Sequence, residues 1–340
     1  MDYTAFINRP SYISPHYSDY GYSSSYVAKQ PRRNVVIEYN GELPVFKKIT
    51  SENMPEIWKI LRTEKGRTTD FSYAGILMWV DYFKYEYAIL NDTLFIKGVV
   101  ENDTSTVAFS LPVGKMDLSE SLGIIKAYCK ANNLRPELSA VPEYAMDEIK
   151  QYNPSYIEEL TDWADYLYDS EKLATLSGKK MGKKRNHVNK FMSLYPDYKL
   201  EPLTSENAHE AMEFMDTFDL EGDSTEMAII ERKLSRDLIS AVEQGDRNLL
   251  GALLKVDGKV CAYTIGDIKG DTLFIHVEKA TRAIEGSYEA INKLFAEVIT
   301  RSYPVIRFIN REDAAGDDGL KKAKESYHPV ELLRKYNVIL

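Results

Sequence analysis

Apolar residues in the first half of the chain recur with two different periods. After Ser51, which we take as an N-cap, they fall at helical spacing to about residue 63. Further on, short apolar runs alternate with turn residues and predict a meander of strands. The predicted elements are strands at 85–90, 93–100, 105–113 and 137–143, and helices at 121–134 and 144–152. This order is typical of a compact α+β unit.

The second half repeats a similar order of elements from about residue 160. Ser205 caps the first of two helices, and Asp257-Gly258 is a strong hairpin signal between two apolar runs. The predicted elements are helices at 205–218, 224–244, 288–299 and 318–327, and strands at 248–267, 272–280 and 304–310. This is the element order of an N-acyltransferase domain of the GNAT type. The pattern therefore predicts an α+β fold of two tandem GNAT-like domains, each a mixed, mainly antiparallel sheet flanked by helices.

The length of the chain supports this division. With 340 residues it exceeds one ordinary domain. We expect an N-terminal GNAT-like domain over 35–160 and a C-terminal one, with the active site, over 161–340. Residues 1–34 are rich in Tyr, Ser and Pro and lack a sustained apolar period. They predict an arm that is disordered or ordered only against the main body.

Composition narrows the class of protein. The chain is 44% hydrophobic and 28% charged, with a formal net charge of −9, which disfavours general nucleic-acid binding and leaves any polyanion to be bound locally. The two cysteines form no CxxC pair, and the five histidines show no ligand spacing, so no metal is expected. There is no secretion signal and no apolar run of the roughly 18 residues that a membrane span needs. We expect a cytoplasmic protein.

Three stretches together resemble a known family. They are DYLYDSEKLATLSGKKMGKKRNHVNKF (165–191), FIHVEKATRAIEGSYEAINKLF (274–295) and FINREDAAGDDGLKKAKESYHPVELLRKY (308–336). They resemble the DUF2156 family, which is related to the C-terminal domain of phosphatidylglycerol lysyltransferases and more distantly to Fem-type peptidyltransferases. The likeness extends over most of the chain from about residue 45.

The resemblance implies a transferase. It predicts transfer of an acyl or aminoacyl group to an amine or hydroxyl acceptor, with acyl-CoA or aminoacyl-tRNA as co-substrate and no tightly bound cofactor. In the lysyltransferases a membrane domain supplies the lipid, and we expect no such domain in this chain, so the acceptor stays open among small molecules, lipids and peptides. The alternative is a catalytically silent GNAT-like protein that binds tRNA or another phosphorylated ligand.

The basic stretch 177–191 is a candidate phosphate-binding site. Its apolar residues fall on one helical face, and its Gly178 and Gly182 do not have the spacing of a nucleotide-triphosphate loop. The stretch is either a solvated basic face or a site for the pyrophosphate of CoA or the backbone of tRNA. The residues assigned to this phosphate-binding site are Lys180, Lys183, Lys184 and Arg185, with Asp165 and Tyr168 as neighbouring partners.

GNAT domains suggest a base and a donor loop in the second block. The strand before the donor loop commonly presents the base, for which Glu278 is the first choice and His276 the second. The alternative for each is a strand-edge ion pair with Lys279 or Arg282. The donor loop itself is only partly matched, by Arg282, Gly286 and Ser287.

The third block supplies the remaining candidates. GNAT domains carry an Asn after the fifth strand and a Tyr four residues after an Ala on the next helix, an order that Asn310, Ala323 and Tyr327 fit. Asn310 would then contact the donor and Tyr327 would protonate the leaving group, unless it is only a packed phenol. The acidic residues between the predicted strand 304–310 and the next predicted helix either hold a cationic substrate or cap that helix. Residues assigned to substrate binding here are Arg311, Glu312, Asp313 and Lys324.

Overall fold

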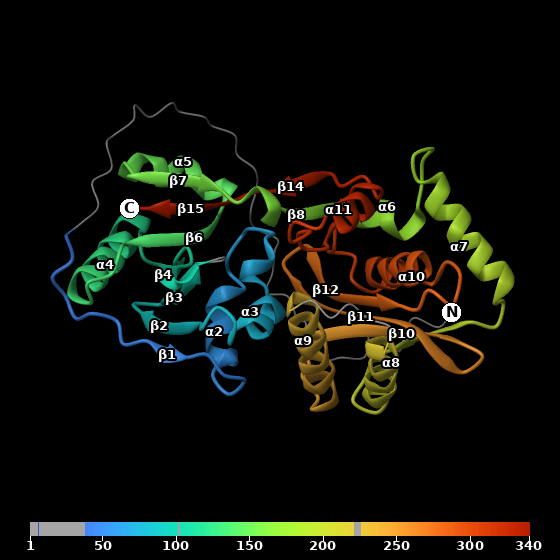
Figure 1. The fold of residues 1–340 in the computed structure, drawn as a ribbon. Coiled ribbons are helices and arrows are strands. Elements are labelled where there is room, and N and C mark those ends of the chain that lie inside the picture. Colours follow the sequence, from blue (N-terminus) through green and yellow to red (C-terminus); the bar gives the residue numbers. More distant parts are fainter. Residues whose placement is uncertain (1–5, 7–37, 101–102, 221–225) are drawn as a thin grey trace.

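The computed structural model describes residue 6 and residues 38–100, 103–220 and 226–340, so the predicted arm over 1–34 lies, apart from Phe6, outside the described residues. Two mixed sheets flanked by helices lie next to each other (Figure 1). This arrangement confirms the predicted α+β class. None of the helices in the described ranges is long and apolar enough to cross a membrane.

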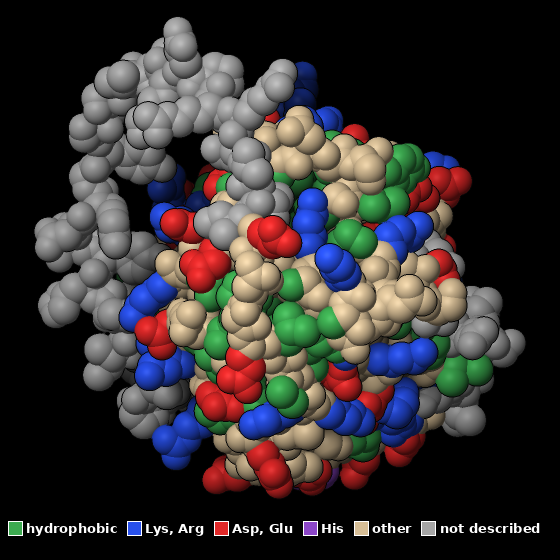
Figure 2. All heavy atoms as spheres, turned by 90° about the vertical axis from the view of Figure 1, so that its left-hand side faces the viewer, with side chains coloured by type: hydrophobic (Ala, Val, Ile, Leu, Met, Phe, Trp, Pro, Cys, Tyr) green, Lys and Arg blue, Asp and Glu red, His purple; other side chains and the backbone are tan. Residues whose placement is uncertain are grey.

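The first sheet has the strand order β1-β2-β3-β4-β6-β15-β7, with β5 paired to β3. Only β4 and β6 run parallel. Its strands are β1 (Lys47–Lys48), β2 (Glu86–Leu90), β3 (Thr93–Val100), β4 (Asp103–Phe109), β5 (Val113–Gly114), β6 (Glu137–Pro142), β7 (Tyr156–Glu159) and β15 (Lys335–Ile339). The helices of this half are α2 (Met54–Leu61), α3 (Tyr73–Trp79), α4 (Leu118–Ala131) and α5 (Met146–Ile149), with 3₁₀ turns η1 (Thr69–Phe71), η2 (Glu143–Ala145), η3 (Lys150–Tyr152) and η4 (Thr161–Trp163). On the outer face of this half, basic and acidic side chains are interspersed (Figure 2).

The second sheet has the order β14-β8-β13-β12-β11-β10-β9, and only β12 and β13 run parallel. Its strands are β8 (Asp165–Asp169), β9 (Lys199–Pro202), β10 (Leu249–Val256), β11 (Lys259–Lys269), β12 (Thr272–Ala280), β13 (Phe308–Asn310) and β14 (Glu331–Leu333). Its helices are α6 (Ser170–Thr175), α7 (Gly182–Leu194), α8 (Ala208–Leu220), α9 (Glu226–Glu243), α10 (Ser287–Ser302) and α11 (Asp318–Glu325). Helix α10 covers one face, with α6 and α7 beside it, and α8 and α9 lie on the other (Figure 1).

The hydrophobic core joins the two halves. Strand β10 sends Leu249 and Leu253 into the same apolar cluster as the first half, while Leu250 and Leu254 face the α10 side, as expected for a period of two. Helix α3 of the first half packs against α9 and β11 of the second. The α8 and α9 side of the second sheet therefore shares one continuous core with the first sheet.

The end of the chain crosses the predicted boundary at residue 160. Strand β14 belongs to the second sheet, but β15 lies in the first sheet between β6 and β7, antiparallel to both. Val338 is fully buried there. The sequence did not predict strands β7, β8 and β15, because each is short and its partner strands are distant along the chain.

Polar contacts also connect the halves. The Arg67 guanidinium donates to both carboxylate oxygens of Asp271 at 3.0 and 2.8 Å. The buried ammonium of Lys269 pairs with Glu64 at 2.5 Å, and Glu64 also accepts from the hydroxyl of Tyr144. These contacts fix the segment before η1 against the second sheet.

Two predicted helix caps are wrong. Helix α2 begins at Met54 with Asn53, not Ser51, at the cap position. Helix α8 begins at Ala208, and the side chain of Asn207 accepts from the backbone N–H of Thr204. In both cases an Asn nearer the helix closes the turn, which a short Asx side chain does readily. The helix predicted over 144–152 is divided into η2, α5 and η3.

Candidate functional site

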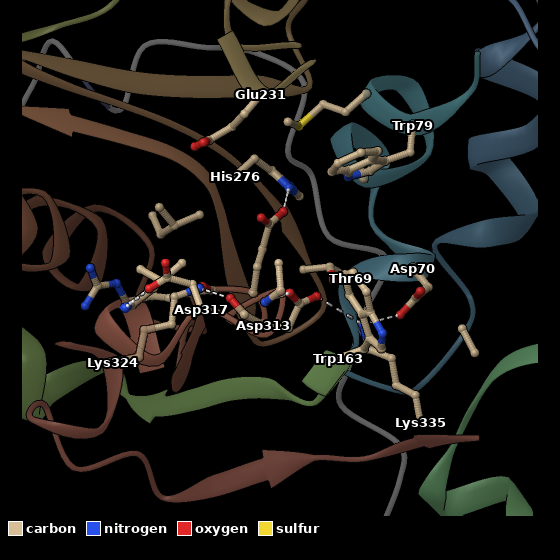
Figure 3. Close-up of a pocket in the computed structure, with 18 of the residues that line it drawn as sticks. Thr69, Asp70, Trp79, Trp163, Glu231, His276, Asp313, Asp317, Lys324 and Lys335 are labelled. Carbon is tan, nitrogen blue, oxygen red and sulfur yellow. Dashed lines mark hydrogen bonds and ion pairs between the residues drawn. The ribbon is translucent and has the colours of Figure 1, made fainter. Parts of the chain in front are cut away.

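A cavity of about 820 Å³ lies between the two halves. One wall comes from η1 and α3 with Thr69, Asp70 and Trp79, and the facing wall comes from β12, the loop after β13 and α11. Figure 3 shows Trp79 and Asp70 on one side of this space and Asp317 and Lys324 on the other. A volume of this size is typical of small-molecule sites.

The parallel strands β12 and β13 separate at the cavity. They pair only from Thr272 with Phe308 to Phe274 with Asn310, after which β12 continues alone on that side to Ala280. The part of β12 that carries His276 and Glu278 therefore has no neighbour where β13 would lie, and both residues belong to the cavity lining. The side chain of His276 is itself fully buried.

A β-bulge places His276. Opposite β11, Ile275 pairs with Gly266 and Val277 pairs with Ile265, so His276 is the extra residue. As a result, Ile275 and Val277 face opposite cores, whereas a regular strand predicts them on one face. Bulges next to active sites commonly redirect a side chain in this way.

Both ring nitrogens of His276 are engaged. Nε2 lies 2.6 Å from Asp267 Oδ1, and Nδ1 lies 2.7 Å from Glu312 Oε1. Burial of the ring opposes its charge, but the two carboxylates outweigh this effect and raise the pKa of His276 to about 10. The ring is therefore an imidazolium at neutral pH and has no lone pair to accept a proton. The geometry does not favour His276 as a general base.

A buried lysine connects the two walls. Lys335, at the start of β15, lies 2.9 Å from Asp70, 2.8 Å from Asp165 and 4.0 Å from Asp313; we call these four residues the Lys335 cluster. Burial alone would lower the pKa of Lys335, yet its acidic neighbours raise it well above the usual value. Asp165 also accepts from Thr69 and Asn310.

Asp313 is the acid of the cluster that lies farthest from the Lys335 ammonium, at 4.0 Å. It lines the cavity, and its Oδ1 accepts from the backbone N–H of Ala315 at 2.8 Å. Burial raises the pKa of Asp313 to about 6, although Lys335 acts in the opposite direction. Asp313 is thus a carboxylate that exchanges a proton near neutral pH.

On the α10 side, cationic groups surround Tyr327. The Arg311 guanidinium lies 4.9 Å from the ring centroid and the Lys184 ammonium 4.2 Å. Arg311 donates to Glu278 at 2.8 Å, and Glu278 also accepts from Asn292 at 3.1 Å. Glu278 therefore pairs with Arg311, and not with Lys279 or Arg282, which the sequence had offered as its alternative partners. Burial raises the pKa of Tyr327, so its phenol stays protonated.

Lys324 holds the loop that contains Arg311 and Asp313. Its ammonium donates to the backbone carbonyls of Arg311, at 2.6 Å, and of Asp313. Burial lowers the pKa of Lys324. The hydroxyl of Tyr168 donates to the backbone carbonyl of Lys324 at 2.8 Å, which anchors α11 to β8.

The structure brings most of the predicted site residues to the cavity. Those that line it are Lys184, His276, Glu278, Arg282, Arg311, Glu312, Asp313, Lys324 and Tyr327. Asp165, Tyr168 and Asn310 are buried next to them. Residues that the structure does not place in the lining are Lys180, Lys183, Arg185, Gly286 and Ser287.

Several of these residues outside the cavity lining contact other parts of the protein. Arg185 donates to the carbonyls of Leu176 and Gly178. A Cβ at Gly286 would lie 2.7 Å from the carbonyl oxygen of His187, so α7 covers the start of α10. The Ser287 hydroxyl donates to the carbonyl of Thr281. Lys180 and Lys183 stay exposed.

Sequence reasoning missed the contribution of the first half and of the chain end. Asp70, Trp79 and Lys335 line the cavity, and Asp267 holds His276. Lys335 lies in the third sequence block but received no role there, and the other three belong to none of the three blocks. Only long-range pairing brings the four residues together. Across the described ranges, no group of three or more His, Cys, Asp or Glu could hold a metal ion.

The chain belongs to the family described as phosphatidylglycerol lysyltransferase, C-terminal, whose model matches residues 62–339. This agrees with the family and the transferase class expected from the three sequence blocks. Among curated proteins, an uncharacterized protein of Mycoplasmoides gallisepticum is 25% identical over 175 residues, which is 51% of this chain and 55% of that protein. The match therefore spans about half the length of the curated relative.

Solved structures share the fold. A conserved protein of unknown function from Bacteroides thetaiotaomicron VPI-5482 is 31% identical, with a TM-score of 0.78 and coverage of 88% of this chain and 100% of that chain. L-PGS from Bacillus licheniformis is 16% identical with a TM-score of 0.57, covering 88% and 93% of the two chains. FemX is 10% identical with a TM-score of 0.57, covering 87% and 97%. The last two likenesses concern the fold alone.

Proposed function

We propose that the protein is an acyl- or aminoacyltransferase of the GNAT superfamily that works in the cavity between two GNAT-like halves. It would transfer the group from an aminoacyl-tRNA or a CoA thioester to an amine or hydroxyl acceptor. The observation that carries this proposal is a cavity lined by both a carboxylate, Asp313, in the loop before α11, and a buried phenol, Tyr327, just after α11. The family to which the chain belongs supports the reaction class.

Asp313 is the proposed general base. The acceptor must lose a proton as it attacks the carbonyl carbon of the donor, and a carboxylate whose pKa is about 6 is ionised at neutral pH yet still basic enough to take that proton. Glu278 is held by both Arg311 and Asn292. We therefore assign Glu278 to fixing Arg311 rather than to proton transfer.

Tyr327 and Lys324 are the proposed acid and oxyanion partner. Attack forms a bond from the acceptor nitrogen or oxygen to the carbonyl carbon, and the ester or thioester bond then breaks. Tyr327 supplies the proton that the leaving oxygen or sulfur needs. Two of the three N–H bonds of Lys324 go to backbone carbonyls, and the third is available to the negative charge on the carbonyl oxygen.

The covered start of α10 favours tRNA over CoA as donor. A pyrophosphate needs free N–H groups at a helix start, but Gly286 packs against α7. The exposed lysines of the basic stretch, Lys180 and Lys183, are suited to phosphates of a tRNA acceptor arm. The same observation also supports the second candidate, a silent protein that binds tRNA or another phosphorylated ligand without transfer.

Transfer assays with single variants test the proposal. The purified protein is incubated with a charged tRNA pool or with acetyl-CoA and a mixed set of amines and alcohols, and products are detected by mass spectrometry. We expect Asp313→Asn and Tyr327→Phe each to lower the rate by about 10²- to 10⁴-fold, and Asp92→Asn, at an exposed surface ion pair, to leave it unchanged. Undiminished transfer by the double variant would exclude these roles. Salt-sensitive tRNA binding without any product would favour the silent protein.

A further inference from the structure

We propose that His276 is a positioning residue that ties the start of α3 in the first half to the loop 311–313 in the second, and so holds the two walls of the cavity at a fixed separation. This inference rests on the proposed function for its kinetic consequence. Its structural part, a link across the two halves, stands independently of any reaction.

The first part of the link runs from His276 to α3. Asp267 Oδ1 accepts from the ring of His276 at 2.6 Å and from the backbone N–H of Ala74 at 3.1 Å. Asp267 Oδ2 accepts from the backbone N–H of Tyr73 at 3.3 Å. Asp267 thus occupies the N–H groups at the first turn of α3, the helix that carries Trp79 into the cavity.

The second part of the link runs from His276 to the loop 311–313. Glu312 adopts a left-handed backbone conformation with φ of 58°, which is unfavourable for a residue with a side chain. Its backbone N–H donates to Asn310 Oδ1 at 2.6 Å, and its carboxylate is held by the ring of His276 at 2.7 Å. Asp313 follows directly, so the position of the proposed base depends on how Glu312 is held.

A charged ring is required at the centre of the link. A neutral imidazole donates from one nitrogen only and would leave one of two carboxylates facing a lone pair. The charged groups in contact with the ring are Asp267 on β11 and Glu312 on the loop after β13, while α3 presents backbone N–H groups. The side chains of His276 and Asp267 are fully buried, so water cannot substitute for either partner. The bulge aims the ring between them.

Hydrogen exchange of His276→Gln tests the structural part. Gln is neutral and reaches only one carboxylate, so we expect amides in both 70–79 and 311–317 to exchange roughly tenfold faster, while α4 exchanges at its normal rate. The matched variant Glu312→Gln should accelerate 311–317 alone. Faster exchange confined to β12, with both segments unaffected, would overturn the link.

Two further measurements separate positioning from catalysis. Nitrogen-15 spectra of the wild type should show both ring nitrogens of His276 protonated at about pH 8; a neutral ring would overturn the proposal even if His276→Gln fails to fold. In transfer assays, His276→Gln should reduce kcat by about tenfold or more and keep the acid limb of the pH profile that Asp313 sets. Loss of that limb would instead identify His276 as the base. If no transfer is detected at all, the exchange and nitrogen-15 results still decide the link.

Discussion

Replacing Lys335 by Met should strongly destabilise the protein. The Lys335 side chain is only 5% exposed, and its ammonium lies 2.9 Å from Asp70 and 2.8 Å from Asp165, whose side chain is fully buried. Removing one partner of a buried ion pair leaves uncompensated charge and typically costs about 3–5 kcal/mol. Met keeps most of the aliphatic volume, so little of this loss comes from a cavity.

The chain offers a matched control. Lys115 and Asp92 form an ion pair of the same length, 2.9 Å, but their side chains are 80% and 70% exposed. Lys115→Met should cost about 0–1 kcal/mol. The free energy of unfolding of each variant is measured by urea denaturation followed by circular dichroism.

The pH dependence adds a second check. Burial already raises the pKa of Asp70, and Lys335 opposes that rise, so the pKa of Asp70 should rise further in the variant. An acid whose pKa is higher in the folded state binds its proton more tightly there, so the deficit of Lys335→Met should shrink as the pH is lowered. A loss as small as that of Lys115→Met, or a deficit that grows at low pH, would refute this account of the cluster.

Three other changes test separate features. Gly286→Ala should cost more than Gly258→Ala, because both glycines have positive φ, which costs about 1–2 kcal/mol for Ala, but only Gly286 meets an α7 carbonyl at 2.7 Å; thermal denaturation compares them. The pKa of His276 is raised from 6.5 to about 10, so its protonation stabilises the fold by about 5 kcal/mol at most. This stabilisation is full below about pH 6.5 and is lost as the pH approaches 10. The gap between wild type and His276→Gln in unfolding free energy should close over that window, and a constant gap would contradict the assignment. Arg67→Lys breaks the two-pronged contact with Asp271 and should cost about 0.5–1.5 kcal/mol; urea midpoints equal to the wild type would show that the contact contributes nothing.

The sequence predicted those parts of the fold that depend on neighbouring residues. The helix of the basic stretch packs Val188 and Phe191 inward as the apolar spacing requires, and the hairpin turn at Asp257 and Gly258 joins β10 and β11. The strand predicted over 272–280 was placed correctly as β12. Its bulge at His276 was not predicted, because a one-residue shift in pairing depends on the partner strand.

The candidate site divides in the same way. By itself the sequence determined the class of fold, the family and the segments that carry His276, Asp313, Lys324 and Tyr327, because periodicity and motifs are local properties of the chain. Only the tertiary structure decided their chemical states. The pKa of His276 depends on Asp267 and Glu312, and the pKa of Asp313 depends on burial and on Lys335. Lys335 reaches them because β15 returns to the first sheet, and electrostatic interactions act over distance in space rather than along the sequence.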